Sequence, residues 1–349
     1  MSNARTDTPS IAARTRTLSA GSPVVAAHFL GTIAALVLGE EAVIFVPPRG
    51  DERRVAIHGG AILASAADGK RIVTGGDDGK VVVTDAAGES EILASDDKKR
   101  WVDHVALAPG GAVAWSAGKA AFVAVAKSGP RALDVASTVG GLSFAPKGLR
   151  LAIAHYNGAT LWFPNAQAAP EFLEWKGSHH DVTFSPDGKF LVTAMQEPTL
   201  HGWRIEDRKH MRMSGYDARV RSLAWTADGR FLATGGSDQL ILWPFDKDGP
   251  MGKTPRLLAP RAARLAVVAC HPKRPIAACG FSDGMVVLVR IDDGAGILAR
   301  PPGAAPISAL AFSADGALLA FGCDDGEAGI VALQASPAKR ADKKPRRPR

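Results

Sequence analysis

The sequence predicts an all-β fold in which one unit is repeated along most of the 349 residues. Three observations support this. A short apolar strand pattern followed by an Asp-Gly turn recurs at intervals of 36–45 residues. A second apolar segment, a second turn and a third apolar segment follow in each copy. No stretch long enough for a helix shows a helical hydrophobic period, so every element is expected to be a strand.

The clearest copies of the unit are residues 181–194, 223–236 and 310–322. Each contains Asp-Gly at its first turn, where Asp bonds to its own backbone and Gly accepts a positive φ. Weaker copies are found at 63–69, 105–111, 142–148 and 268–272. The residues that end the first strand of each unit align as Phe29, Ser65, Leu107, Phe144, Phe184, Trp225, Cys270 and Phe312. The sequence therefore predicts eight units.

The apolar segment 24–39 imitates a signal peptide or a membrane span, but it is short of a full span and contains His28. It also aligns with the repeat, so we interpret it as two strands and expect neither export nor membrane insertion. Only three cysteines occur in the chain. This number is too small for a disulfide scaffold and favours a reducing compartment, the cytoplasm.

The net charge of +7 is concentrated in the two ends of the chain. Residues 1–16 carry a net charge of +2 and residues 339–349 a net charge of +6, which leaves −1 for residues 17–338. We expect a flexible segment at 1–13, a folded body at 14–335 and a disordered basic tail at 336–349. The basic residues of this tail are Lys339, Arg340, Lys343, Lys344, Arg346, Arg347 and Arg349.

Three units close with a tryptophan, at Trp162, Trp203 and Trp243, and another closes with Thr84-Asp85. Together with the Asp-Gly turns, these residues resemble the WD-repeat β-propeller family over about residues 15–334. The resemblance implies a single β-propeller of four-stranded blades around a channel. Eight blades are expected from the eight units, and seven, the commonest count in the family, is the alternative. Residues 14–18 are expected to supply the outer strand of the last blade and so to close the ring.

The family's hydrogen-bonded set of Asp, His, Ser or Thr, and Trp is incomplete in every unit of this sequence. Thr234, Asp238 and Trp243 come nearest to it but lack the histidine.

Catalytic and metal sites are not predicted. The Asp-Gly pairs at Asp68, Asp187, Asp228 and Asp315 occupy the same turn of different units, so they are interpreted as turn formers. No nucleophile elbow or phosphate-binding loop followed by a helix is present. Cys270 and Cys279 replace apolar residues of the repeat and are expected to be core thiols. We expect no enzymatic activity, no metal and no cofactor.

The resemblance implies that partners dock on the rim of the channel, at the start of each innermost strand and just after the second strand. The candidate partner-binding residues at these positions are Trp101, Asp103, Tyr156, His180, Gln196, Arg219, Arg221, Arg264 and Phe281. Arg219 and Arg221 are spaced two apart on a predicted strand, so both point to the same side.

The predicted function is a non-enzymatic scaffold, a monomer by itself, that binds a protein or peptide on this rim. The alternative is a nucleic-acid-associated factor, with the basic tail as the polyanion-binding segment.

Overall fold

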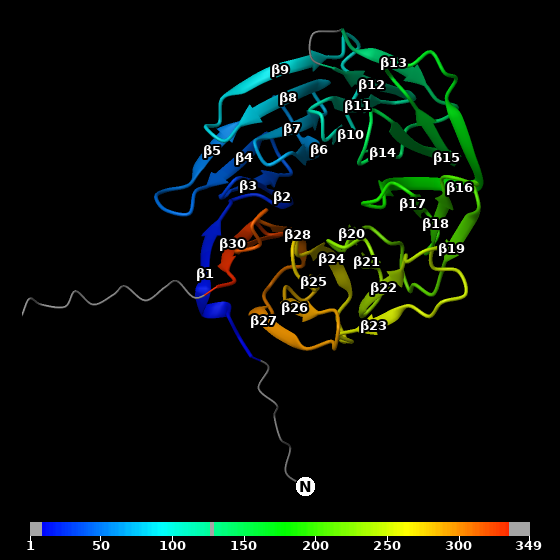
Figure 1. Ribbon diagram of the computed structural model, residues 1–349. Helices are drawn as coiled ribbons and strands as arrows, with labels where there is room; N and C mark the ends of the chain where they lie inside the picture. The colour runs from blue at the N-terminus through cyan, green and yellow to red at the C-terminus, as the bar shows by residue number, and fades with distance from the viewer. Residues whose placement is uncertain (1–8, 126–128, 335–349) are drawn as a thin grey trace, which may run out of the picture.

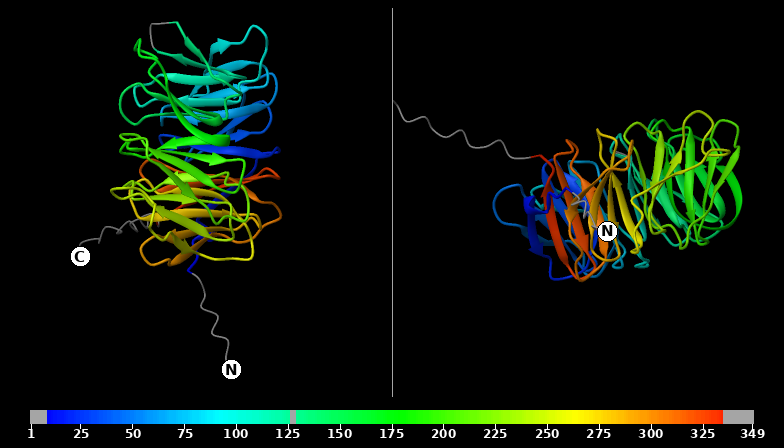
Figure 2. Two further views of the ribbon diagram at one scale, coloured as in Figure 1. Left: turned by 90° about the vertical axis from the view of Figure 1, so that its right-hand side faces the viewer. Right: turned by 90° about the horizontal axis from the view of Figure 1, so that it is seen from below.

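The computed structural model of the chain describes residues 9–125 and 129–334. Within them, thirty strands and one 3-10 helix, η1 (Ala12–Arg14), form a ring of sheets (Figure 1). Seen edge-on, the ring is thinner than it is wide (Figure 2). No described helix is long and apolar enough to cross a membrane. The expectation of an all-β propeller is confirmed.

Six sheets of the ring contain four antiparallel strands each. One contains β2 (Val24–Leu30), β3 (Ile33–Leu38), β4 (Ala42–Val46) and β5 (Arg53–Ala56); the next contains β6 (Ile62–Ala67), β7 (Arg71–Gly76), β8 (Lys80–Asp85) and β9 (Ser90–Ser95). A third contains β10 (His104–Leu107), β11 (Val113–Ala117), β12 (Ala120–Ala124) and β13 (Arg131–Asp134). Further along the chain lie β20 (Leu223–Trp225), β21 (Phe231–Thr234), β22 (Leu240–Pro244) and β23 (Arg256–Leu258), then β24 (Leu265–Cys270), β25 (Ile276–Phe281), β26 (Val286–Arg290) and β27 (Gly296–Arg300). The last contains β28 (Ile307–Phe312), β29 (Leu318–Cys323), β30 (Glu327–Ala332) and β1 (Thr15–Ser19).

The seventh sheet has six strands: β14 (Gly141–Phe144), β15 (Leu151–Trp162), β16 (Glu171–Phe184), β17 (Phe190–Met195), β18 (Leu200–Arg204) and β19 (His210–Met213). It joins two sequence units, because β16 pairs with β15 through its first half and with β17 through its second half. Counted as hydrogen-bonded sheets, the ring therefore has seven members, which matches the alternative count. The eight separate sheets expected first are not found, although all eight units contribute strands to the ring.

The N-terminal strand closes the ring, as expected. β1 occupies the outer edge of the last sheet and pairs with β30 over five residue pairs, from Thr15 opposite Val331 to Ser19 opposite Glu327. Residues 9–13, part of the segment expected to be flexible, lie along β27, where the Leu298 amide donates to the Pro9 carbonyl at 2.8 Å. The other calls on the chain ends, residues 1–8 and the basic tail from 336 onward, lie outside the described residues.

The hydrophobic core lies between neighbouring sheets rather than in one centre. Leu36 of β3 and Ala320 of β29 belong to one buried cluster, so the first and last sheets pack face to face. The innermost strands also contact their neighbours around the ring, as β2 does with β28 and β6. Alternate side chains of each strand enter the two interfaces on either side of its sheet.

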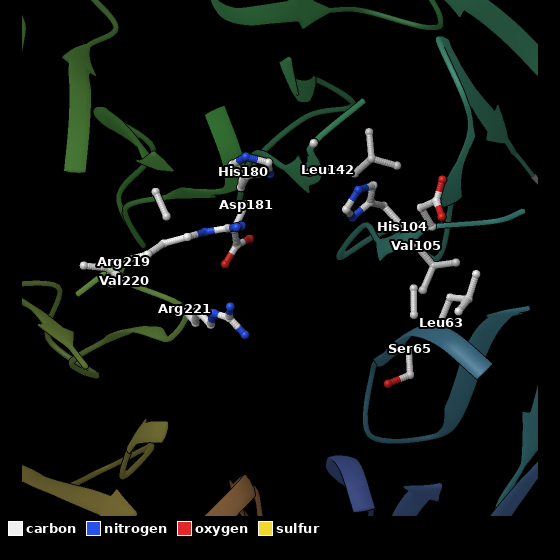
Figure 3. Close-up of a pocket in the computed structure, with 15 residues that line it drawn as sticks. Leu63, Ser65, His104, Val105, Leu142, His180, Asp181, Arg219, Val220 and Arg221 are labelled. Atoms are coloured by element: carbon white, nitrogen blue, oxygen red, sulfur yellow. The ribbon is translucent and has the colours of Figure 1, made fainter. Parts of the chain in front are cut away.

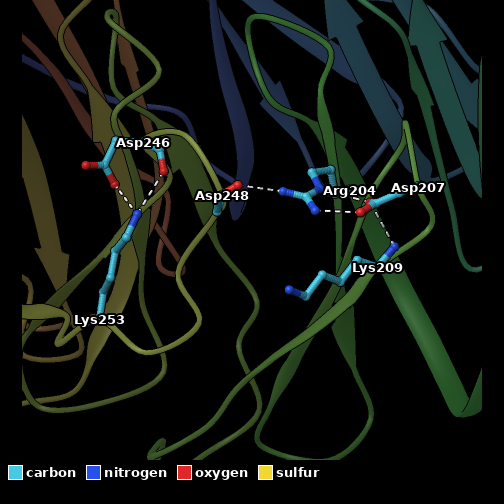
Figure 4. A network of polar contacts seen from close by, with 6 residues as sticks. All are labelled: Arg204, Asp207, Lys209, Asp246, Asp248 and Lys253. Carbon is cyan, nitrogen blue, oxygen red and sulfur yellow. Dashed lines mark hydrogen bonds and ion pairs between the residues drawn. The ribbon is translucent and has the colours of Figure 1, made fainter.

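Polar contacts between units add to this packing on the surface. Arg204, the last residue of β18, donates to Asp207 at 2.9 Å and to Asp248 of the following unit at 2.7 Å (Figure 4). Lys253 pairs with Asp246 in the same loop. The Arg204 guanidinium lowers the pKa of the Asp207 carboxyl. Because these groups lie at the surface and are in contact with solvent, their ion pairs link the units with little effect on stability.

A tyrosine occupies the place of the histidine that the sequence lacks beside Trp243. The Tyr216 hydroxyl accepts from Trp243 Nε1 at 2.6 Å and lies 2.9 Å from Thr234 Oγ1. Burial raises the pKa of Tyr216 to about 12, so the hydroxyl keeps its proton. Asp238 accepts from Ser237 instead of joining this network. The family's hydrogen-bond set is therefore rebuilt in part with a different residue type.

The Tyr216→Phe substitution is expected to destabilise the protein by about 1–3 kcal/mol, because it leaves Trp243 Nε1 buried without an acceptor. Tyr156→Phe is the matched control: that side chain is 53% exposed, and its hydroxyl has no partner among the described residues. Urea denaturation of both variants measures the difference. Equal midpoints for the two variants would show that the Tyr216 hydroxyl contributes nothing.

Candidate functional site

A cavity of about 400 Å³ opens at the centre of the ring, where the innermost strands begin (Figure 3). We call it the channel mouth. Five consecutive units line it, with residues Leu63–Ser65, Asp103–Val105, Gly140–Leu142, His180, Asp181, Ala194 and Arg219–Arg221. The cavity is therefore built by segments that lie far apart in the sequence and that only ring closure brings together.

A β-bulge in β16 brings Asp181 into the channel mouth. The pairing of β16 with β17 shifts register between His180 and Val182, and Asp181 adopts φ = 56°. This bulge lies against the glycines of the neighbouring unit: a Cβ on Gly140 would meet the His179 carbonyl oxygen at 2.1 Å, and one on Gly141 would meet the Asp181 Cα at 2.7 Å. The two glycines thus provide the space that this strained residue needs.

Arg219 and Arg221 enter the channel mouth from the segment before β20 (Figure 3). Arg219 Nη1 donates to Gln196 Oε1 at 3.1 Å, and its buried Nε has no hydrogen-bond partner. Arg221 is exposed to the cavity. Neither guanidinium has a carboxylate within 4.0 Å among the described residues. The pair can therefore accept an anionic group from outside the chain.

Burial decides the protonation of the other polar groups at the channel mouth. It lowers the pKa of His104 to about 4. It also lowers the pKa of His180, and the positive charge of Arg219 lowers that pKa further. Both imidazoles are therefore neutral at pH 7. Burial raises the pKa of Asp103 and of Asp181, so these carboxyls ionise less readily than free ones.

A second hollow, of about 470 Å³, lies beside the channel mouth on the six-stranded sheet. We call it the Trp175 hollow. Its lining residues are Tyr156, Trp175, Lys176, Gly177, Ser178, Met195, Gln196, Glu197, Thr199 and Arg212. Trp175 is held from two sides: His179 Nε2 donates to its carbonyl at 2.9 Å, and its ring stacks on His201 with centroids 3.9 Å apart. The hollow therefore has a fixed aromatic wall.

Comparisons with known proteins agree with this architecture. The family described as "WD domain, G-beta repeat" matches residues 208–243 and 298–330. The chain is a β-propeller, and two of its segments match the WD repeat.

Two similar proteins give the extent of the likeness. The Arabidopsis thaliana protein "Cell division cycle 20.1, cofactor of APC complex" is 30% identical over 97 residues, which cover 26% of this chain and 21% of that protein. The match thus spans about a fifth of the relative's length. The crystal structure of the computationally designed Ika8 protein superposes with a TM-score of 0.73 at 18% identity, over 90% of this chain and 98% of that chain. The second likeness shows the fold alone.

The propeller brings four of the nine predicted rim residues into one cavity. Asp103, His180, Arg219 and Arg221 line the channel mouth, and Gln196 joins them through its hydrogen bond with Arg219. Gln196 and Tyr156 line the Trp175 hollow. The remaining three lie apart: Trp101 and Arg264 are exposed outside both cavities, and Phe281 is fully buried.

The expectation that Phe281 is available to a partner is wrong. Its side chain is 0% exposed within the core cluster around β24 and β25, and the Arg261 guanidinium covers its ring at 5.2 Å. Phe281 lies at the end of the second strand of its sheet, where the resemblance places rim residues. Its side chain, however, points into the interface between neighbouring sheets. The group that covers Phe281 at this place in the propeller is the half-buried Arg261, which also pairs with Asp283 at 2.9 Å.

Sequence reasoning missed Asp181 and Trp175. In the sequence, Asp181 is only the first residue of a repeat copy. Nothing in the sequence pattern indicates the bulge that brings its side chain into the channel mouth. Trp175 stands in an outer strand, where the repeat carries no signature. The glycine pair 140–141 was the available signal for a close backbone approach, because its Cβ-free positions face the bulge.

No group of three or more His, Cys, Asp or Glu within the described ranges could hold a metal ion. Burial raises the pKa of the Cys270 thiol to about 12 and raises that of Cys279 further. Both thiols are therefore protonated and inert at neutral pH.

Proposed function

We propose that this propeller is a non-enzymatic scaffold in the cytoplasm that binds a protein or peptide partner at the channel mouth. WD-repeat propellers generally serve as platforms for protein interaction, and that general role supports the class of partner. The relative from Arabidopsis thaliana is described as a cofactor of a larger complex, which favours the same class.

The observation that carries the proposal is the pair Arg219 and Arg221, two arginines without a carboxylate partner in a cavity built by five units. Arginines in partly enclosed sites often contribute most of the energy of an interface. The hydrogen bond of Arg219 to Gln196 holds this side chain in place before a partner arrives, which lowers the entropy cost of binding.

The test is affinity purification from the native host with the full chain and with the double variant Arg219→Glu/Arg221→Glu. We expect the charge reversal to reduce recovery of the bound partner at least about tenfold, because it removes two interface arginines. The matched control is Lys273→Glu/Arg274→Glu, which reverses two exposed cations at the turn between β24 and β25. This control should retain the partner.

The same purification separates the alternative function. Nuclease treatment and deletion of residues 338–349 should leave the partner bound if the channel mouth is the site. Recovery that depends on nuclease-sensitive material and on the basic tail, and not on Arg219 and Arg221, would contradict the scaffold proposal. It would favour a nucleic-acid-associated factor.

A further inference from the structure

The channel mouth and the Trp175 hollow form one continuous surface. Gln196 lines the hollow and accepts a hydrogen bond from Arg219 of the channel mouth at 3.1 Å. Ser178 lines the hollow as well, and its Oγ lies 3.2 Å from Nε2 of His180, which lines the mouth. The two cavities therefore adjoin each other, and one extended ligand can reach both.

The continuity of this surface follows from the unbroken course of β16. The pairing of β16 with β15 extends to Ser178, which lies opposite Tyr156, and its pairing with β17 begins at the next residue, His179. Elsewhere the outer strand of one unit is joined to the inner strand of the next by a longer loop, as between β9, which ends at Ser95, and β10, which begins at His104. Because β16 is one continuous strand, no loop joins the two units at this place.

The hollow has the chemistry of a site for an apolar side chain. Trp175 and Met195 contribute its apolar surface, and Met195 is itself only 4% exposed. Gly177 leaves room there, because a Cβ at this position would meet Met195 Cε at 2.7 Å. The stacking of Trp175 on His201 fixes the wall before a ligand arrives.

The rim of the combined surface carries cations without carboxylate partners. Lys176 and Arg212 are exposed at the hollow and form no ion pair with any described residue, and Arg219 and Arg221 lie at the mouth. Glu197 is the single acid of the hollow's lining. Asp103 and Asp181 also line the channel mouth and disfavour a second carboxylate beside them, so an incoming acidic group is expected on the side of Gln196 and the arginines.

We propose that the partner segment is an extended acidic peptide that places a carboxylate against Arg219 and Arg221 and an apolar side chain in the Trp175 hollow. This inference rests on the proposed function and specifies its ligand. Ser178 and His180 are two residues apart on β16, about 7 Å along an extended strand. The acidic and apolar residues of the ligand should therefore lie one to three positions apart.

The test is selection of random peptides displayed on phage, with the immobilised full chain as bait. We expect the enriched peptides to combine Asp or Glu with a large apolar residue within three positions. For the most enriched peptide, fluorescence anisotropy should show at least about tenfold weaker binding to Arg219→Glu/Arg221→Glu, and unchanged binding to Lys273→Glu/Arg274→Glu.

Two further variants report on the hollow. The Trp175→Ala variant should bind the peptide and a version with its apolar residue replaced by Ala with equal affinity. It should still bind the acidic peptide more tightly than a version without the acid. Lys176→Glu/Arg212→Glu changes only exposed side chains and should weaken binding of the acidic peptide without affecting the fold.

The outcomes distinguish the two proposals. Enriched peptides that are neutral or basic, and that still depend on Arg219 and Arg221, would overturn the acidic ligand and leave the scaffold function standing. Absence of any peptide that depends on the channel mouth or the hollow, combined with partner recovery unaffected by the arginine reversal, would overturn both.

Discussion

Deletion of residues 1–19 is expected to remove the cooperative unfolding transition of the propeller. The deletion takes away β1, which pairs with β30 over five residue pairs and places Leu18 against the buried cluster between the first and last sheets. Several hydrogen bonds at about 0.5–1.5 kcal/mol each, together with the lost apolar burial, amount to at least about 4 kcal/mol. This approaches the whole stability of a typical domain.

Deletion of residues 1–8 is the matched control, because it keeps β1, η1 and the contact of Pro9 with Leu298. Guanidinium unfolding followed by circular dichroism should give a single transition for this control and a broad, early loss of signal for the longer deletion. The longer deletion also exposes the backbone edge of β30, so it should aggregate during purification. An unchanged midpoint after deletion of residues 1–19 would show that ring closure does not depend on β1.

The strands of this fold could be predicted from the sequence because their signals are local. Asp187-Gly188 and Asp228-Gly229 mark turns by their own conformational preferences, and both glycines have positive φ in the structure. The closing strand could also be predicted. The last unit lacks an outer strand of its own, so the strand before the first unit, β1, can complete its sheet.

The features that could not be predicted depend on spatial neighbours. The merging of two units through β16 requires that its two halves meet different strands, and no residue in 171–184 signals this. Tyr216 replaces an expected histidine because its longer side chain brings a hydroxyl to Trp243 and Thr234. The direction of Phe281 is set by the interface that it fills.

The candidate site shows the same division. Arg219 and Arg221 were predicted to point to the same side from a strand; the structure has no strand at these residues, which precede β20, but both line the channel mouth. Asp181 and Trp175 become candidates only when the bulge of β16 and the stacking on His201 are known. Positions on the rim can thus be assigned from a repeat, whereas the cavities between units need the folded ring.

Acidification is expected to destabilise the propeller through His201. This side chain is 0% exposed, and neither ring nitrogen has a hydrogen-bond partner within the described structure. Its ring stacks on Trp175 and meets Trp203 edge-on with centroids 4.7 Å apart. Burial and, to a smaller extent, repulsion from His179, His210 and Arg212 lower the pKa of His201 to about 3.

The sign follows from linkage between protonation and folding. The unfolded chain holds a histidine with its ordinary pKa of about 6.5, so it binds a proton at a higher pH than the folded chain does. The stability contributed by neutral His201 is therefore fully present above pH 6.5 and is lost progressively as the pH falls toward 3. At pH 4 the loss from this residue is on the order of 3 kcal/mol.

His201→Phe is the variant that isolates this effect. Phenylalanine keeps an aromatic ring against Trp175 and Trp203 but cannot take up a proton, and any packing cost of its larger ring is present at every pH. Urea denaturation at pH 7 and at pH 4 should show a smaller loss of unfolding free energy for the variant than for the unsubstituted chain. His104, whose pKa is also lowered to about 4, contributes in the same direction to both proteins and cancels in the comparison.

The His201→Phe variant also tests the Trp175 hollow when peptide binding is measured as a function of pH. Trp175 is both the stacking partner of His201 and a wall of the proposed peptide site. Protonation of His201 places a charge against the Trp175 ring without a compensating acceptor, so the wall should loosen before the whole ring unfolds. Binding of an acidic peptide should then weaken more in the unsubstituted chain than in His201→Phe as the pH falls below 4 toward the pKa of His201, about 3. Equal pH dependence of stability and binding in the two proteins would show that His201 is not the group that couples acid to the hollow.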